Sequence, residues 1–426
     1  MMFRKIIFIV GAGLIALCVS CTRKQERVIK VLTFRDRQSS ALRAVLPAFE
    51  KEFAVRVQFD DIPASTVATK MMTDLAAGGT YDVYAVDEPF IPQFHDALLP
   101  VEQWPKMQSI DNLSGFEVKA LEAARFQGAT VGLPVNGNVY QYIFRKDLFE
   151  NLVEKENFRK QFQRELQPAK NFTELLELAQ FFHRPPKLYG FGPFTKMSEG
   201  TTVELLWLLA GFGYRPGTTH LDIQTITRAL ELYDALLKTA PKAARAWHHT
   251  ERMSSYAKGR IAQMMTWNSF FFDLEDEHKS LVVGRTGYAS SPGNDATGIA
   301  GTWIAGIRKN SKEAELAATF VRWWTSKEVN EGLIPKGLST ARADLLTRTD
   351  LGAKFPWLGS THLNFNSAFL RPRHKQYRTT SDELSKAFTR WIAGQKTLAE
   401  TATDLQTALG RMNELALGGS QRQGAH

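Results

Sequence analysis

The chain has 426 residues, which is more than one hydrophobic core usually supports, so two or three domains are expected. Hydrophobic residues make up 44% of it and charged residues 23%, as in an ordinary folded protein, and no low-complexity tract interrupts it. The net charge of +9 is spread along the sequence, with no basic stripe interleaved with aromatic residues. Nucleic-acid binding is therefore not predicted.

The first twenty residues have the pattern of a secretory signal peptide. Two positive charges are followed by a short apolar run over residues 6–19, and the small residue Ser20 precedes Cys21. The run is too short to span a membrane. A cysteine in this place resembles a bacterial lipobox, in which Cys21 would carry a diacylglycerol, although Cys18 stands where Leu is usual. We expect an extracytoplasmic, lipid-anchored protein; a signal peptide without lipidation is the alternative.

The cysteine count agrees with this interpretation. Cys18 and Cys21 are the only two cysteines, and the mature chain would keep Cys21 alone, so no internal disulfide is expected. No later segment has about 18 consecutive apolar residues, so no other membrane span is predicted. The fold must therefore be stabilised by a large core.

Strands and helices alternate in the first ninety residues. Alternating or continuous apolar residues predict strands over Val28–Phe34, Val55–Phe59 and Tyr81–Val86, and helical periodicity predicts helices over Ala41–Phe53 and Ser65–Ala77. This order implies a parallel sheet in an α/β lobe.

Ligands of such sheets bind beyond the carboxyl ends of the strands. The first candidates for a site are therefore Arg35 with Asp36 after the first strand, and Asp87 with Glu88 after the third. Exposed acids after a strand are more often only solvated, but the turn expected at Pro89 favours a defined position for this pair.

The stretch from Gly132 to Phe149 is typical of a hinge between two lobes. Pro134 predicts a bend, Asn136 and Asn138 add polar amides, and alternating apolar residues then predict a strand. Asn offers both a donor and an acceptor to a hydroxyl-rich ligand. The alternative is an ordinary loop before a core strand.

The remainder of the chain is richer in helices. A buried strand over Ile261–Thr266 ends at Trp267 and Asn268, and a strand over Val282–Ala289 follows it. Helices are expected with Asn171 as N-cap, over 203–210, around 226–237, from Ser311 to Trp324, over Ser381–Ala393, and over Thr397–Met412, where Thr397 and Glu400 form a capping box.

Sequence signatures of catalysis are absent. The chain has no GxxxxGK[ST] phosphate loop, no GxGxxG after a strand, no HExxH and no GxSxG. No cysteine ligand is available for a structural zinc site. Asp87 and Glu88 are adjacent, so along an extended segment they point opposite ways, a poor geometry for a glycosidase pair. No cofactor, metal or enzymatic activity is predicted.

Several motifs, in order, resemble the extracytoplasmic solute-binding proteins of bacterial ATP-binding-cassette (ABC) importers, in their sugar-binding branch. The motifs are the strand and helix over 31–53, KMMTDLAAGG at 70–79, YDVYAVDEPF at 81–90, and the stretches 133–149, 259–272, 301–310 and 371–373. Each motif is loose by itself, but together they span nearly the whole mature chain.

The resemblance implies a two-lobed α/β fold of the class II periplasmic-binding-protein type, with a ligand cleft between lobes joined by a multi-segment hinge. Hinge crossings are expected near Pro134–Asn138, near Val282–Tyr288 and after Trp324. The expected divisions are a signal peptide at 1–20, a tether at 21–27, lobe 1 at 28–135 plus 284–325, lobe 2 at 136–283 plus 326–417, and a flexible tail at 418–426.

The resemblance also implies a sugar site. A pyranose ring has an apolar face that aromatic rings cover and a rim of hydroxyls that polar side chains bind. Trp267 and Trp303 are the expected stacking platforms, with a core position as the alternative for each. The expected polar partners are Asp87, Glu88, Asn136, Asn138 and Arg371, and further candidates are Phe34, Arg35 and Asn268; a surface salt bridge is the alternative for Arg371.

The implied mechanism is capture without bond chemistry. The lobes would close on a sugar, and the closed protein, a monomer, would dock on a membrane permease whose ATPase partners drive import. Alternatives are a binding protein for a polyol, a glycerol phosphodiester or a peptide, and a secreted glycoside hydrolase or lyase, which would share the aromatic residues and acids.

Overall fold

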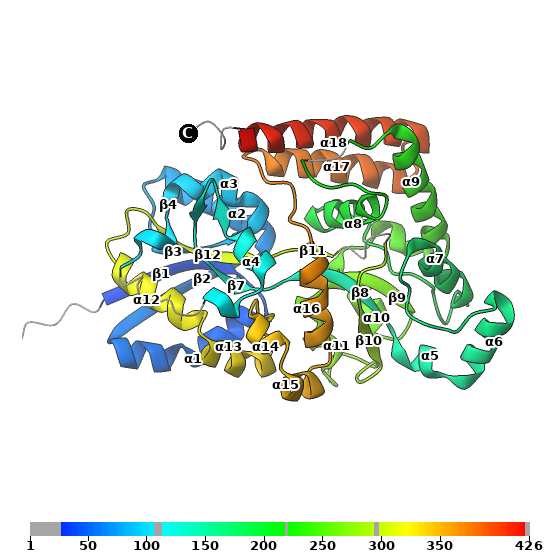
Figure 1. Ribbon diagram of the computed structural model, residues 1–426, viewed down its shortest axis with the longest axis horizontal. Helices are drawn as coiled ribbons and strands as arrows, with labels where there is room; N and C mark the ends of the chain where they lie inside the picture. The colour runs from blue at the N-terminus through cyan, green and yellow to red at the C-terminus, as the bar shows by residue number, and fades with distance from the viewer. Residues whose placement is uncertain (1–26, 106–112, 218–219, 294–297, 422–426) are drawn as a thin grey trace, which may run out of the picture.

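The computed structural model describes residues 27–105, 113–217, 220–293 and 298–421. The chain forms two lobes side by side, each built on its own β-sheet (Figure 1). The fold class expected from the sequence, a two-lobed α/β fold, is confirmed. The predicted signal peptide and Cys21, with nearly all of the tether, lie outside the described residues.

Lobe 1 is built on a sheet of six described strands in the order β2-β1-β3-β12-β4, with β7 also paired to β12. Strand β1 runs parallel to β2 and β3, whereas β12 runs antiparallel to its neighbours. The parallel core of the sheet is therefore the one predicted from the alternating pattern. The bounds are β1 Arg27–Phe34, β2 Val55–Ile62, β3 Val83–Asp87, β4 Leu98–Leu99, β7 Leu133–Asn136 and β12 Trp303–Arg308.

Helices cover both faces of this sheet. Helix α1 begins after Asp36, whose carboxylate accepts a hydrogen bond from the Ser39 N–H at 2.9 Å, and it buries Leu42, Leu46 and Phe49 against the strands. The other helices of lobe 1 bury apolar faces in the same way. The bounds of the lobe 1 helices are α1 Arg37–Phe53, α2 Ala64–Ala76, α3 Ile91–Phe94, α4 Val118–Ala123, α12 Ala314–Trp324 and α13 Lys327–Leu333.

Lobe 2 is organised around β8, Val139–Arg145, every residue of which is buried. Strands β9, β10 and β11 all pair with β8 in antiparallel register. Because β8 is the central strand, the side chains on both of its faces are buried. The bounds of its partners are β9 Gln263–Trp267, β10 Thr286–Ala289 and β11 Ile299–Ala300.

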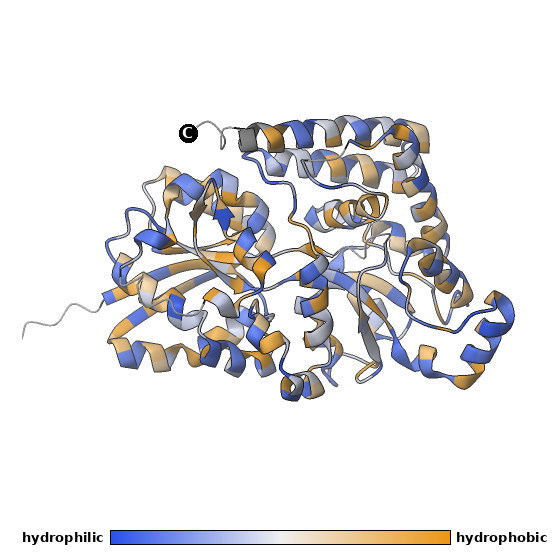
Figure 2. Ribbon diagram, viewed as in Figure 1, coloured by the Kyte–Doolittle hydropathy of each residue, from blue (hydrophilic) through white to orange (hydrophobic). Residues whose placement is uncertain are grey.

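Most of the longer helices belong to lobe 2. Two of them, α17 and α18, lie side by side along one edge of the lobe and pack on α8 and α9 (Figure 1). Apolar residues concentrate on the strands and on the inner helix faces (Figure 2). The bounds are α5 Lys146–Glu150, α6 Leu152–Phe162, α7 Phe172–Phe181, α8 Glu199–Ala210, α9 Ile223–Lys238, α10 His249–Ala257, α11 Phe271–Leu274, α14 Ala343–Leu346, α15 Thr349–Lys354, α16 Trp357–Ser367, α17 Tyr377–Ile392 and α18 Leu398–Gln421.

The first hinge crossing is where the sequence predicts it. Strand β7 ends in the lobe 1 sheet at Asn136, and β8 begins in the lobe 2 sheet at Val139. The expected crossing near Val282–Tyr288 is wrong. Strand β10 pairs with β8, and β11 does so too, so the chain returns to lobe 1 only between Ala300 and Trp303.

The third crossing also differs from the expectation. Helix α13 packs against α1 and α12 of lobe 1, so the chain stays with lobe 1 beyond Trp324. It leaves near residues 338–342, where Ser339 accepts a hydrogen bond from the N–H of Gly137 in the first crossing at 2.7 Å. At the C-terminus, residues 418–421 continue α18 instead of forming a flexible tail, and residues 422–426 lie outside the described part.

Within the described ranges, no helix combines the length and the apolar character needed to cross a membrane.

Candidate functional site

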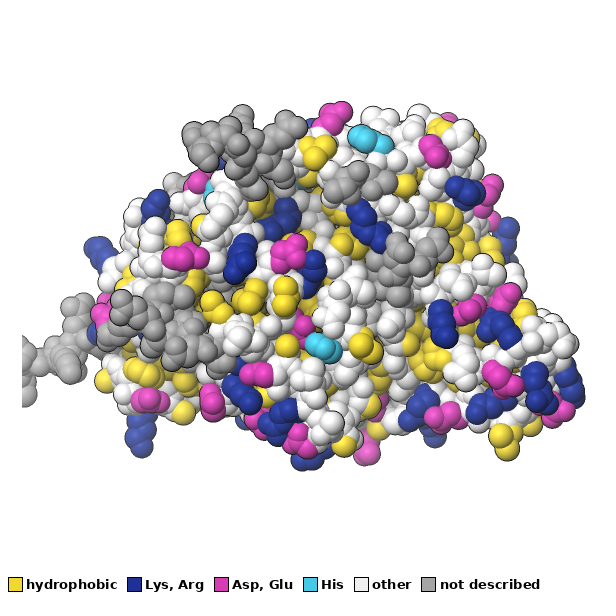
Figure 3. Space-filling view, in the orientation of Figure 1, with side chains coloured by type: hydrophobic (Ala, Val, Ile, Leu, Met, Phe, Trp, Pro, Cys, Tyr) yellow, Lys and Arg dark blue, Asp and Glu magenta, His cyan; other side chains and the backbone are white. Residues whose placement is uncertain are grey.

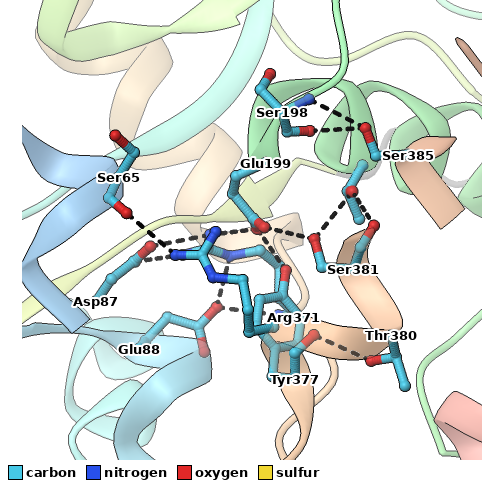
Figure 4. Close-up of polar contacts among 12 residues, drawn as sticks. Ser65, Asp87, Glu88, Ser198, Glu199, Arg371, Tyr377, Thr380, Ser381 and Ser385 are labelled. Atoms are coloured by element: carbon cyan, nitrogen blue, oxygen red, sulfur yellow. Dashed lines mark hydrogen bonds and ion pairs between the residues drawn. The ribbon is translucent and has the colours of Figure 1, made fainter. Parts of the chain in front are cut away.

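The two lobes meet at a strap of residues 368–378, which joins α16 to the first turn of α17. Arg371, in the middle of the strap, is only 2% exposed. Its guanidinium contacts Asp87 and Glu88, which follow β3 in lobe 1, and Glu199, which opens α8 in lobe 2 (Figure 4). The distances from the guanidinium nitrogens to these carboxylate oxygens are 3.1, 3.1 and 3.0 Å, respectively.

The strand order explains why these residues meet. Asp87 ends a parallel strand, so its side chain lies at the carboxyl edge of the lobe 1 sheet, where ligands of such sheets bind. Glu88 accepts two hydrogen bonds from Arg371, one from its backbone N–H and one from Nε, both at 3.1 Å. Asp87 accepts from both terminal nitrogens of the guanidinium, a bidentate geometry.

Lobe 2 holds Glu199 in place. The Tyr377 hydroxyl donates to one carboxylate oxygen of Glu199, and the Ser381 hydroxyl donates to the other at 2.6 Å. Tyr377 and Ser381 lie one turn apart on α17, so both face the start of α8 (Figure 4). Arg371 is therefore bonded to a lobe 1 pair and to a carboxylate that lobe 2 orients.

The charges of this cluster do not balance. Three carboxylates surround one guanidinium, and one oxygen of Glu88 is buried with no hydrogen-bond partner among the described residues. Burial raises the pKa of Glu88 to about 7, although the attraction of Arg371 opposes this shift. Burial also raises the pKa of Asp87. For Arg371, burial alone would lower the pKa, but Asp87 and Glu88 raise it well above its ordinary value.

Trp303 forms an aromatic wall at the same edge of lobe 1. It begins β12, directly opposite Asp87 in the register of β12 with β3. Its ring centroid lies 4.1 Å from that of Phe34, at the end of β1, with the two planes tilted by 35°. Trp303 is 7% exposed, so most of its surface is packed within lobe 1.

Trp267 lies on the lobe 2 side. It ends β9, packs edge-on against Tyr140 at 5.1 Å between ring centroids, and has the Arg371 guanidinium carbon 5.8 Å from its ring centroid. It also packs on the crossing at Gly301, where an added Cβ would lie 2.5 Å from its ring. Arg371 thus connects Trp267 with the lobe 1 acids beside Trp303.

The three asparagines expected to bind ligand are engaged in the first crossing. Asn136 is fully buried and donates to Gln38 at 2.7 Å. The Asn268 side chain accepts from the N–H of Val139 and donates to the carbonyl of residue 137, both at 3.0 Å. The Asn138 side chain accepts from the N–H of residue 269 at 3.2 Å. The amides of Asn138 and Asn268 fasten the irregular backbone at this crossing, whereas Asn136 is tied to α1 and its amide oxygen is buried with no hydrogen-bond partner among the described residues.

Arg35 lies apart from the cluster. Its side chain is 65% exposed and donates to the backbone carbonyl of Asp61 at 2.8 Å. The structure thus brings together Asp87, Glu88, Arg371, Trp267, Trp303 and Phe34, and leaves Arg35 on the surface. Sequence reasoning missed Glu199, Tyr377 and Ser381, since no local signal places residue 199 beside residue 371.

A second buried polar cluster lies inside lobe 2. Glu204 accepts hydrogen bonds from the hydroxyls of Tyr140 and Tyr233, and Arg252 lies 3.8 Å from it. Burial raises the pKa of Glu204 against the attraction of Arg252. The charged groups of Glu204 and Arg252 are fully buried. Tyr140 also packs edge-on against Trp267, so this cluster supports that ring from within lobe 2.

One further cavity lies away from the place where the two lobes meet. A cavity of about 590 Å³ lies on the outer side of lobe 2 along α7, beside the surface ion pair of Arg164 and Glu177. Its lining includes Phe172, Phe212, Glu174 and Glu177, but it lies within lobe 2, away from the interlobe cluster at Arg371. Among the described residues, no group of three or more His, Cys, Asp or Glu side chains has the arrangement of a metal site.

Two α/β lobes, a triple crossing and an interlobe cluster of acids and aromatic rings define a two-lobed binding protein. A model of the bacterial extracellular solute-binding protein family matches residues 35–331, well over half of the chain. The chain belongs to this family, whose members are extracellular and bind solutes.

The known relatives have low sequence identity to this chain but match most of its length. A probable amino-acid ABC transporter periplasmic-binding protein of Sinorhizobium fredii is 21% identical over 350 residues, 77% of this chain and 75% of the relative. Maltose-bound MalE3 of T. maritima superposes with a TM-score of 0.78 at 20% identity, covering 90% of this chain and 99% of that one. A ribitol complex of an ABC transporter solute-binding protein from Agrobacterium radiobacter gives 0.76 at 22% identity, covering 91% and 98%.

Proposed function

We propose that this protein captures a sugar or polyol between its lobes and delivers it to the permease of an ABC importer. The observation that carries the proposal is the convergence of Asp87, Glu88 and Trp267 on Arg371 where the two lobes meet, with Trp303 opposite Asp87 in the sheet. The structural relatives support the ligand class, since one holds maltose and another ribitol. The name of the Sinorhizobium relative points to an amino acid, which the experiment below includes.

The chemistry of the cluster suits a hydroxyl-rich ligand. The side chains of Asp87 and Glu199 are 14% and 24% exposed, so part of each lies open to a ligand. Hydrogen bonds to charged carboxylates are roughly twice as strong as those between neutral groups. Trp267, which is half-buried, offers a ring to the apolar face of a sugar once the lobes part.

The predicted ligand residues divide into two groups in this proposal. Asp87, Glu88, Trp267 and Trp303 bind the ligand, with Glu199 added and Arg371 at the rim. Asn136, Asn138 and Asn268 serve the hinge through the bonds described above. Phe34 supports Trp303 from behind.

We propose that Cys21 carries a lipid, which holds the protein, as a monomer, at the outer side of a bacterial membrane beside its permease. Lobe closure around the ligand would create the surface that the permease recognises.

Hydrolysis of a glycoside is the less favoured function. The family is one of solute-binding proteins. In addition, Asp87 and Glu88 share one guanidinium, whereas glycosidases place two carboxyl groups about 5 to 9.5 Å apart on opposite sides of the scissile bond.

The test is a tryptophan-fluorescence titration of the chain from residue 22, which keeps every described residue. The panel contains maltose, ribitol, mannitol, a glycerol phosphodiester and several amino acids. The proposal predicts a saturable change with a sugar or polyol, with the ligand recovered intact. Trp267→Ala should weaken binding about tenfold or more, equal to about 1.4 kcal/mol.

Trp323→Ala is the matched control, because Trp323 is also half-buried but lies on α12, packed on Phe49 and Phe320. It should leave the affinity unchanged. If only an amino acid gives a saturable change, the ligand class is an amino acid instead of a sugar or polyol. A cleaved glycoside in the recovered sample would move the protein to the hydrolases.

A further inference from the structure

A narrow apolar slot lies beside the acids of the interlobe cluster. Helix α2 encloses it on one side and the ends of β3 and β12 on the other, and its volume is about 10 Å³. Asp87 and Trp303, both ligand residues in the proposed function, belong to its lining. The slot therefore borders the proposed ligand site.

The sequence of α2 accounts for the slot. Val67, Ala68 and Met71 lie within about one helical turn of each other and face the strands, with Ala64 one turn earlier. Alanine at positions 64 and 68 leaves a space between α2 and Trp303 that a longer side chain would fill. The slot thus follows from which residues α2 turns toward the sheet.

The outer end of the slot lies where the two lobes meet. Helix α2 is on the side of lobe 1 nearest α17 (Figure 1), and Arg378 of α17 donates to the carbonyl of Ser65 at 3.3 Å. Ala64 is exposed, whereas Met71 and Phe94, at the inner end, are buried. A ligand group held between the lobes therefore meets the slot at its Ala64 end.

The lining of the slot favours carbon over oxygen. Apart from Asp87 it consists of alkyl and aromatic side chains, and both carboxylate oxygens of Asp87 accept hydrogen bonds from Arg371. A hydroxyl placed among Val67, Met71 and Phe94 would lose its hydrogen bonds to water and gain no partner there. Burying a polar group without a partner is unfavourable, so a hydroxyl is excluded.

The size of the slot sets a second limit. A volume of about 10 Å³ is near the smallest that holds one water-sized group. A methyl group is close to that size, whereas a hydroxymethyl group adds an oxygen beyond the carbon. Most hexoses end in hydroxymethyl, and deoxy sugars of the rhamnose and fucose kind end in methyl. Size and polarity therefore select the same group.

We propose that this slot selects a deoxy sugar with a terminal methyl group over the parent sugar with a terminal hydroxymethyl group. The inference rests on the proposed function, since it needs a sugar bound beside Asp87 and Trp303. The methyl group enters the slot, and the neighbouring ring hydroxyls meet Asp87. Hydrophobic side chains lie among charged ones over the region where the lobes meet, a mixture that suits such a ligand (Figure 3).

Calorimetric titration of the chain from residue 22 with matched pairs of sugars tests this. The pairs are quinovose and D-glucose, D-fucose and D-galactose, and L-rhamnose and L-mannose, which differ only in the terminal hydroxyl. One misfitting group in an apolar pocket changes affinity by about 10- to 200-fold. In at least one pair, the deoxy sugar should therefore bind about tenfold or more tightly than its parent.

Ala68→Val tests the slot itself, because the added carbons occupy it from α2. This variant should lose the preference for the deoxy sugar. Ala76→Val is the matched control, since Ala76 lies on the same helix but is exposed, and it should keep the preference. Circular dichroism checks the fold of both, and the wild-type affinities decide the question by themselves if Ala68→Val does not fold.

Two outcomes would overturn the inference and leave the proposed function standing. One is binding of maltose, ribitol or another member of the panel with no preference for the deoxy sugar in any pair. The other is an unchanged preference in a folded Ala68→Val variant. Absence of binding by any sugar or polyol would instead remove the proposed function and the inference together.

Discussion

Gly301 lies at the second crossing, and replacing it with Ala is expected to disturb the site as well as the fold. An ideal Cβ at this position would lie 2.5, 2.7 and 3.3 Å from three ring carbons of Trp267. Real Cβ contacts are essentially never closer than 3.0 Å, so the ring or the backbone must shift. The ring also packs edge-on against the buried Tyr140, which limits how far it can shift.

The magnitude follows from overpacking. Forcing one extra carbon into a well-packed site costs about 1 to 3 kcal/mol, and a lobe of this size loses roughly 2 to 4 °C of Tm per kcal/mol. Thermal unfolding of Gly301→Ala should therefore occur about 2 to 12 °C below the wild type. Because the displaced ring is Trp267, its fluorescence spectrum should shift as well.

Gly359→Ala is the control, since Gly359 lies within α16 and a Cβ there meets nothing within 4 Å. Ala is the better helix former, so this variant should be unchanged or more stable by about 0.5 to 1 kcal/mol. If Gly301→Ala has the wild-type Tm and the wild-type fluorescence, Trp267 is not held over the crossing, and the reasoning about its position is refuted.

Three further predictions concern the buried charges. Arg252→Met leaves Glu204 without its cation in the lobe 2 core and should lower the free energy of unfolding by about 3 to 5 kcal/mol in urea titrations. The double variant Arg252→Met/Glu204→Gln should recover part of this loss. Equal losses in the two variants would show that the pair is not coupled. The pKa of Glu88 is raised from its ordinary 4.5 to about 7, so the folded protein binds the extra proton and stability should fall by about 3 kcal/mol as pH rises from 4.5 to 7. That slope should be absent from Glu88→Gln, and two parallel pH profiles would contradict the burial argument. Asp87→Asn weakens the bidentate contact with Arg371 and removes a charged acceptor, so calorimetry should give at least a tenfold weaker Kd for the ligand, whereas an unchanged Kd would remove Asp87 from the site.

The strands of lobe 1 and the start of the last helix of lobe 2 were predictable because their signals are local. The alternation from Val28 and Val55 gives β1 and β2, and the capping box of Thr397 and Glu400 gives the start of α18 through bonds of 2.8 and 3.2 Å. The expected return to lobe 1 at residue 284 was wrong because its signal is not local. A short strand such as β10 carries no local mark of the sheet it joins, and pairing with β8 decides it.

The site was predictable in part for the same reason. Asp87 and Glu88 follow a strand of a parallel sheet, which marks them from sequence alone. Glu199 is 172 residues from Arg371 in the chain, and only the tertiary packing of α8 against α17 brings the two together. The ligand contacts expected of Asn136 and Asn268 stay a prediction; in the structure Asn268 bonds to backbone groups of the first crossing, which need donors and acceptors, and Asn136 bonds to Gln38.

The most direct test of the central claim is a calorimetric titration of the chain from residue 22 with maltose and ribitol, followed by chromatography of the recovered ligand. The account predicts one-site binding of a sugar or polyol, weakened at least tenfold in Trp267→Ala and Asp87→Asn, with the ligand returned intact. Binding that is unaffected by both substitutions would contradict the interlobe site. Absence of binding by any sugar or polyol would contradict the proposed ligand class.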